Sequence, residues 1–225
     1  MKKLFAIVLT LLIGFSAVSA QDFTLGGRLG VVFGFHSFPD EFFYPDSGLE
    51  EEHTKSNFNF AFYGAYALTD RLSLQAELNF MINQGIKFSF SEEYYGLEGA
   101  YKISITNSSL DIPILLKFAV AKKPVLIGLL AGPHLSFPLG KLILSGDIED
   151  LDMVEYSQYS TNGITFGLST GLFAGFPVGR GRITGDIRFL FDFTPVNIHD
   201  FSYGKNFDTF TRQGVALTAG YEFSF

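Results

Sequence analysis

The chain of 225 residues has room for one β domain, and it is apolar for a water-soluble protein, with a mean hydropathy of +0.24 and 17% charged residues. The absence of Cys excludes a disulfide scaffold, a thiolate metal site and a lipid-anchored N-terminal Cys, and the net charge of −7 argues against nucleic acid as a partner. After the N-terminus no stretch approaches the roughly 20 apolar residues of a transmembrane helix, so the hydrophobicity must follow another pattern.

Residues 1–20 have the form of a secretory signal peptide. Lys2 and Lys3 form a basic start, an apolar run covers 4–15, and small residues fill 17–20. A membrane anchor would need a longer apolar run. We therefore predict cleavage after Ala20, which leaves a domain of residues 21–225 and, with two lysines removed, changes the formal charge from −7 to −9.

From Phe23 onward the dominant period is two, which is the period of a β-strand. One parity is apolar in segment after segment and is rich in Phe, Leu and Ile. The pattern predicts eight strands, at residues 25–35, 58–66, 72–82, 110–120, 125–137, 164–176, 183–193 and 215–225.

The opposite parity of these strands carries the charges, five of each sign. A soluble β-barrel such as a lipocalin has the reverse arrangement, with a charged exterior. Here the apolar parity must face lipid, because an Arg or Lys at the bilayer midplane costs roughly 2–4 kcal/mol. The inward charges are Arg28, Glu77, Lys87, Asp111, Lys117, Asp186, Arg188, Asp192, Arg212 and Glu222.

Charges inside a narrow barrel must be paired. Arg28 lies near the start of the first strand and Glu222 near the end of the last, so closure of the barrel should make them neighbours. Glu77 and Lys117 lie on adjacent strands at similar heights, and Asp186 is close to Arg188. We predict these three as structural charge pairs of the lumen.

The connections alternate in length, as in outer-membrane barrels with short periplasmic turns and longer extracellular loops. An even number of strands then places both termini in the periplasm. The short turns are 68–71, 121–124 and 177–182, and the long polar segments are 36–56, 89–102, 138–160 and 195–211.

Inward glycines recur at every fourth position in several strands. An eight-stranded lumen is just wide enough to be filled by side chains, so small residues should face large ones. This favours a packed barrel over a diffusion pore. The glycines are Gly26, Gly30, Gly34, Gly128, Gly132, Gly163, Gly167, Gly171 and Gly175.

The segment Leu110–Lys117, LDIPILLK, resembles the fourth-strand signature of the PorT-like outer-membrane β-barrel family, and the ending GYEFSF is similar to that of the family. The resemblance implies an eight-stranded antiparallel up-and-down transmembrane barrel, inserted by the barrel assembly machinery, which favours a C-terminal aromatic residue. The founding member is linked to a secretion system, but no residue here is diagnostic of that role. Pro113 lacks an N–H group, so we expect a bulge there.

His134 and Ser136 form the most specific catalytic candidate, because they resemble the His-x-Ser pair of outer-membrane lipid A deacylases. Phe137 replaces the family's Asn, and the pair points into the lumen, away from lipid. The acidic residues at 147–152 lack the Gly and closing Glu of a calcium loop, and the four His show no ligand spacing. We predict no catalytic residue, metal site or cofactor.

The long segments contain 16 Asp/Glu and four Lys, whereas the short turns contain five Lys/Arg and one Asp. Acidic loops beside anionic lipopolysaccharide suggest bridging by divalent cations or capture of cationic ligands. Loop aromatics could supply ligand contacts or could form an interfacial girdle. The candidate contacts are Phe42, Phe43, Tyr44, Tyr94 and Tyr95.

The sequence therefore predicts a monomeric barrel in the outer membrane of a Gram-negative bacterium, with a structural or interaction role through acidic outer loops. Outer-membrane lipid, lipopolysaccharide and, during insertion, the assembly machinery are the expected partners. Two alternatives stay open at this stage: an enzyme acting on lipid A or peptide at the rim, and an accessory component of a secretion system.

Overall fold

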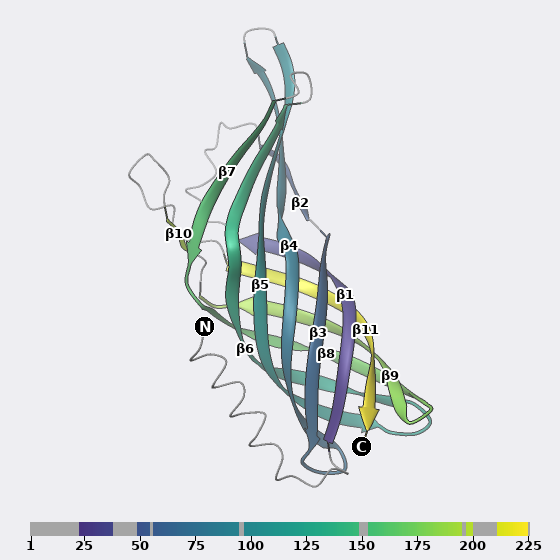
Figure 1. Ribbon diagram of the computed structural model, residues 1–225. Helices are drawn as coiled ribbons and strands as arrows, with labels where there is room; N and C mark the ends of the chain where they lie inside the picture. The colour runs from purple at the N-terminus through teal and green to yellow at the C-terminus, as the bar shows by residue number, and fades with distance from the viewer. Residues whose placement is uncertain are drawn as a thin grey trace.

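The computed structural model describes residues 23–37, 49–54, 56–94, 97–148, 153–194, 197–199 and 211–224, and all regular structure in them is β-strand (Figure 1). Eight strands form the barrel wall, and three further strands pair beyond it. The wall consists of β1 (Phe23–Ser37), β3 (Ser56–Ala67), β4 (Leu72–Tyr94), β5 (Leu97–Ala121), β6 (Leu126–Ile148), β8 (Thr165–Val178), β9 (Gly181–Asp192) and β11 (Thr211–Ser224). The additional strands are β2 (Leu49–Thr54), β7 (Met153–Asn162) and β10 (Asn197–His199).

The wall closes because β1 pairs antiparallel with β11 on one side and with β3 on the other. Every other wall strand pairs with its neighbours in chain order, from β3–β4 round to β9–β11. The predicted fold, a closed antiparallel barrel of eight strands, is confirmed. The short connections gather at one end of the barrel, which we call the turn end, and the opposite end is the loop end.

Two connections predicted as long polar loops are largely strand. β4 and β5 remain paired as far as Tyr94 and Leu97, and β6 continues to Ile148, where it pairs with β7. Figure 1 shows these strands rising well beyond the rest of the wall at the loop end. The prediction of loops was wrong for these segments. Their polar side chains show where the strands extend beyond the lipid-facing part of the wall, but the hydrogen bonds between strands can continue in water.

The two faces of the wall differ sharply in exposure. On β3, Phe58 is 73% exposed and Phe62 is 62% exposed, whereas Asn57 and Asn59 between and beside them are 3% exposed. An outward face of this kind is suited to lipid, because apolar side chains there would be unfavourable in water. No helix among the described residues is long and apolar enough to span a membrane.

The inward glycines make room for large lumen side chains. A Cβ atom at Gly26 would overlap the ring of Tyr63, and one at Gly128 would lie 2.6 Å from the ring of Phe173. A Cβ at Gly167 would lie 2.5 Å from His134 Nε2. Each of these glycines is paired directly with the large residue on the adjacent strand, so small residues lie beside large ones on the inner face of the wall.

The turns at the turn end are built by specific residues. Thr69 Oγ1 accepts hydrogen bonds from the backbone N–H groups of Arg71 and Leu72, at 3.2 and 3.0 Å, which fixes the first turn. Gly179 has φ of 61°, in the left-handed region that glycine adopts without strain, and it begins the tight β8–β9 turn.

The expected bulge at Pro113 is not present. Ile112 pairs with Leu135, Pro113 with His134 and Leu116 with Ala131, all in one register. The missing N–H group therefore interrupts the ladder locally and inserts no extra residue.

Candidate functional site: the braced barrel lumen

Ten charged side chains face the lumen among the residues whose side chains are described, five of each sign. Nine of them belong to the predicted inward set. The remaining predicted residue, Lys87, has a side chain outside the described residues. The tenth observed charge is Arg182, which was predicted to lie in a turn although Arg182 lies on the same face of its strand as Asp186 and Arg188. The cations are Arg28, Lys117, Arg182, Arg188 and Arg212, and the acids are Glu77, Asp111, Asp186, Asp192 and Glu222.

Four of these residues form what we call the turn-end network: Arg28, Glu77, Asp186 and Arg188. Arg28 forms an ion pair with Glu77 and donates a hydrogen bond of 3.2 Å to Asp186 Oδ2. Arg188 donates a hydrogen bond of 2.8 Å to Glu77 Oε2 and one of 3.1 Å to Asp186 Oδ2. Each charge therefore contacts two charges of opposite sign, and the network is neutral.

Lys117 joins this network through an amide. Its Nζ donates to Gln75 Oε1 at 3.0 Å, and Gln75 Nε2 donates to Glu77 Oε1. The ammonium also lies 4.4 Å from the centroid of the Phe173 ring. Glu77 and Lys117, expected as a direct pair, are thus linked through Gln75, because β4 and β5 place Ser73 opposite Lys117.

Glu222 is paired with Arg182, whose Nη1 lies 2.6 Å from Glu222 Oε1, while the hydroxyl of Tyr63 donates to Glu222 Oε2 at 3.5 Å. The expected Arg28–Glu222 pair is therefore replaced by two others. The reason is register: Glu222 lies opposite Gly26, and Arg28 lies opposite Gly220, two residues further toward the loop end.

The other lumen charges form the loop-end network, which we define as Asp111, His134, Asp192 and Arg212 with the hydroxyls around them. Arg212 Nη2 lies 3.1 Å from Asp111 Oδ2, and Arg212 Nε lies 3.0 Å from Asp192 Oδ2. His134 Nε2 lies 2.7 Å from Asp192 Oδ1. One arginine thus contacts two carboxylates, and an imidazole and several hydroxyl groups make their remaining contacts.

The hydroxyls divide between the two acids. Ser109 and Ser136 donate to Asp111 Oδ1, and Thr165 donates to Asp192 Oδ2 at 3.1 Å. His134 Nδ1 lies 3.0 Å from Ser169 Oγ. The catalytic candidate of the sequence is therefore rearranged: His134 contacts Ser169 and Asp192, whereas Ser136 contacts Asp111.

Ser169, His134 and Asp192 have the residue types of a hydrolytic triad, but all three are at most 5% exposed within the packed lumen. A nucleophile needs an open position for the reacting carbon. The arrangement suits an acid held by donors, which is a stabilising role.

Each network contains a contact that crosses the whole barrel. In the order of strands around the wall, β4 and β9 are four positions apart out of eight, and so are β5 and β11. Glu77–Arg188 joins the first two strands and Asp111–Arg212 joins the second two, and we call these contacts the transverse braces. Between them on β9 lies Leu190, which packs with Val32, Met81 and Ala216.

The predicted loop contacts lie outside the side chains that the structure describes. Phe42, Phe43, Tyr44 and Tyr95 lie outside the described residues, and Tyr94 is the last residue of β4, with an undescribed side chain. The signal peptide at 1–20 also lies outside them. No group of three or more His, Cys, Asp or Glu within the described part of the chain could hold a metal ion.

Comparison with solved structures gives similar barrels at low sequence identity. The outer membrane protein OprG from Pseudomonas aeruginosa matches with a TM-score of 0.54 and 12% identity, over 91% of this chain and 96% of that chain. Neisserial surface protein A matches with a TM-score of 0.44 and 12% identity, over 92% of this chain and 98% of that chain. The outer membrane protease OmpT from Escherichia coli matches with a TM-score of 0.45 and 9% identity, over 92% of this chain and 98% of that chain. The likeness to OprG shows the fold alone.

The search of curated proteins found no matching sequence. The family model described as outer membrane protein beta-barrel domain matches residues 19–197, which is most of the chain. Together with the closed wall and its apolar outer face, this match identifies the chain as a member of the outer membrane protein beta-barrel domain family, a small eight-stranded barrel of the outer membrane.

Proposed function

We propose that this protein is a sealed barrel that anchors an interaction surface in the outer membrane, and that it is not a porin. The observation that carries this proposal is the pair of transverse braces. Glu77–Arg188 and Asp111–Arg212 each connect opposite sides of the wall, and the residues around them are buried. An eight-stranded barrel filled in this way leaves no water-filled channel for solutes.

The interaction surface is the loop end. There β4, β5 and β6 continue beyond the barrel and, with β2, β7 and β10, form a projecting sheet (Figure 1). The connecting segments at this end are rich in acidic residues, whereas the turns at the other end are basic. A projecting acidic sheet supports binding of cationic ligands, or of lipopolysaccharide through divalent cations.

The loop end faces the outside of the cell in this proposal, and both termini lie in the periplasm. The signal-like residues 1–20 support export, and the match to the outer-membrane barrel family supports insertion through the barrel assembly machinery. The LDIPILLK segment on β5 supports a place among PorT-like barrels, in which case the partner at the loop end would belong to a secretion apparatus.

Single cysteines test both the orientation and the surface, because the chain has no Cys of its own. Ser47→Cys and Gly96→Cys should react with an impermeant thiol reagent on intact cells. Thr69→Cys and Lys122→Cys, at the turn end, should react only after the outer membrane is opened. Bifunctional crosslinkers attached to the first pair should then join the barrel to its partner.

Reversed labelling would show that the turn end faces outward and would overturn the orientation. Crosslinking of the loop-end cysteines to lipopolysaccharide or to outer-membrane proteins supports the interaction role. Crosslinked products confined to the turn-end cysteines would place the working surface in the periplasm and contradict the proposal.

A further inference from the structure

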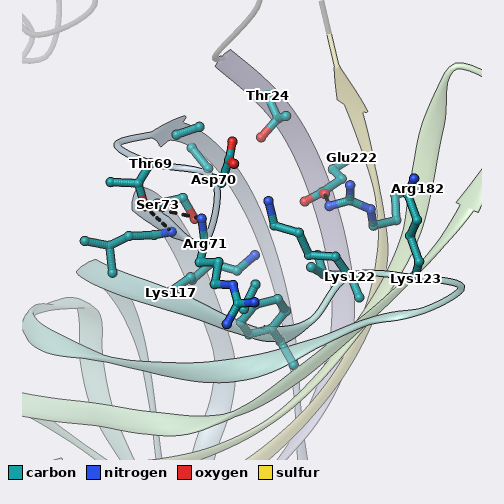
Figure 2. Close-up of a pocket in the computed structure, with 16 residues that line it drawn as sticks. Thr24, Thr69, Asp70, Arg71, Ser73, Lys117, Lys122, Lys123, Arg182 and Glu222 are labelled. Carbon is teal, nitrogen blue, oxygen red and sulfur yellow. Dashed lines mark hydrogen bonds and ion pairs between the residues drawn. The ribbon is translucent and has the colours of Figure 1, made fainter.

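A cavity of about 350 Å³ opens at the turn end, beneath the first two turns and inside the strand ends (Figure 2). We call it the turn-end vestibule. Its floor includes Lys117, Leu126 and Phe173, and its rim includes Arg71, Lys122 and Lys123. The volume falls within the range of small-molecule sites, roughly 300–1,000 Å³.

The vestibule has a surplus of positive charge. Five cations and two carboxylates line it, which is a net charge of +3. Arg182 and Glu222 neutralise each other at 2.6 Å, so the surplus belongs to Arg71, Lys117, Lys122 and Lys123 against Asp70. Figure 2 shows Arg182 beside Glu222, whereas Arg71 lies on the other side of the cavity. Cations gathered around one cavity repel each other unless an anion lies among them.

Lys117 connects the vestibule to the lumen. It is 8% exposed, and its ammonium is held by Gln75 Oε1 at 3.0 Å and by the Phe173 ring at 4.4 Å. An ammonium has three donors, so these contacts leave an N–H group for a ligand in the cavity that Lys117 lines. The backbone of Arg71 is fixed by the first turn, because Thr69 Oγ1 accepts its N–H group at 3.2 Å.

We propose that the turn-end vestibule binds a phosphate-bearing anion, with Arg71, Lys117 and Lys122 as its ligands. A surplus of three positive charges matches a multiply charged anion better than a single carboxylate. Arg and Lys are the usual phosphate-binding side chains, Arg as a fork of donors and Lys as a point charge. The phosphate can belong to a free small molecule or to a lipid headgroup at the membrane surface.

The test uses the folded full-length barrel with two probes. Titration with inorganic pyrophosphate in an uncharged detergent, at constant ionic strength, measures binding of a free anion. Native mass spectrometry after reconstitution into mixed phosphatidylcholine and phosphatidic acid vesicles measures retention of a lipid whose phosphomonoester headgroup can carry two negative charges. We expect saturable one-to-one binding of at least one probe, which identifies the source of the phosphate.

Exposed variants locate the site without disturbing the lumen. Arg71→Gln and Lys122→Gln should each weaken binding by at least about tenfold, because each removes a charged hydrogen bond to the anion. Arg180→Gln is the matched control, since Arg180 lies in the third turn of the same end and outside the cavity lining. Lys117→Gln should weaken binding further, and heat modifiability on gels checks that this variant remains folded.

Three outcomes would overturn the proposal. The first is the absence of saturable binding for both probes. The second is equal weakening by Arg180→Gln, which would show general attraction to a basic surface. The third is unchanged binding in Arg71→Gln and Lys122→Gln, which would place the anion elsewhere.

Discussion

The two lumen networks use opposite ways of holding buried charge. In the turn-end network, Arg28 and Arg188 alternate with Glu77 and Asp186, so every group touches two partners and the set is neutral. In the loop-end network a single Arg212 lies between Asp111 and Asp192, and the remaining contacts come from hydroxyls and an imidazole.

The number of cations in each network determines how much stability the network should lose when one charged residue is removed. Loss of one member of the turn-end network leaves three charges that can still pair. Loss of Arg212 leaves two carboxylates in a packed interior, where unpaired charge is costly. The turn-end network therefore keeps a cation when one arginine is lost, whereas the loop-end network depends on Arg212 alone.

The largest effect is expected for Arg212→Met. It should lower the free energy of unfolding by about 3–5 kcal/mol or more, because Asp111 and Asp192 lose their shared cation. The matched variant Arg188→Met leaves Arg28 between Glu77 and Asp186 and should cost less. Urea unfolding of both barrels in lipid vesicles measures the two losses, and an equal or reversed order would contradict the comparison.

A smaller net effect is expected when a brace is removed as a unit. Glu77→Met alone leaves Arg28 and Arg188 with Asp186 as the one remaining carboxylate of the network. Glu77→Met combined with Arg188→Met leaves one arginine, Arg28, paired with Asp186. The double variant should therefore be more stable than the sum of the single losses predicts. A double-mutant cycle in urea measures this coupling, and strictly additive losses would mean that Glu77 and Arg188 act independently.

The smallest effect is expected in ion conductance. In planar bilayers the wild type should show no steady large current, because two braces cross a filled interior. Glu77→Ala with Arg188→Ala removes one brace and leaves Asp111–Arg212, so its current should stay close to the wild-type baseline. A stable porin-like current in the wild type would replace the sealed barrel with a transport function.

Much of this architecture could be predicted from the sequence, because it depends on local alternation. Phe58 and Phe62 point outward and Asn57 and Asn59 inward since successive side chains on a strand lie on opposite faces. The bilayer does not tolerate charged side chains on the outward face, so the eight strands and the inward position of the charges follow from the period of two. Arg182 was missed because the predicted turn covered residues 177–182, whereas β9 already begins at Gly181.

The partners of the inward charges were decided by the tertiary structure. Arg188 meets Glu77 across 111 positions of sequence, and Arg212 meets Asp111 across 101. Such contacts depend on the register of every strand between them and on which strands lie opposite after closure. Arg28 and Glu222 are offset by two residues in the register of β1 and β11, and each forms an ion pair with another residue. Glu77 and Lys117 are linked through Gln75, which lies two positions from Glu77 on the same strand. Alternation determines which face a side chain occupies, whereas register and closure determine what it touches there.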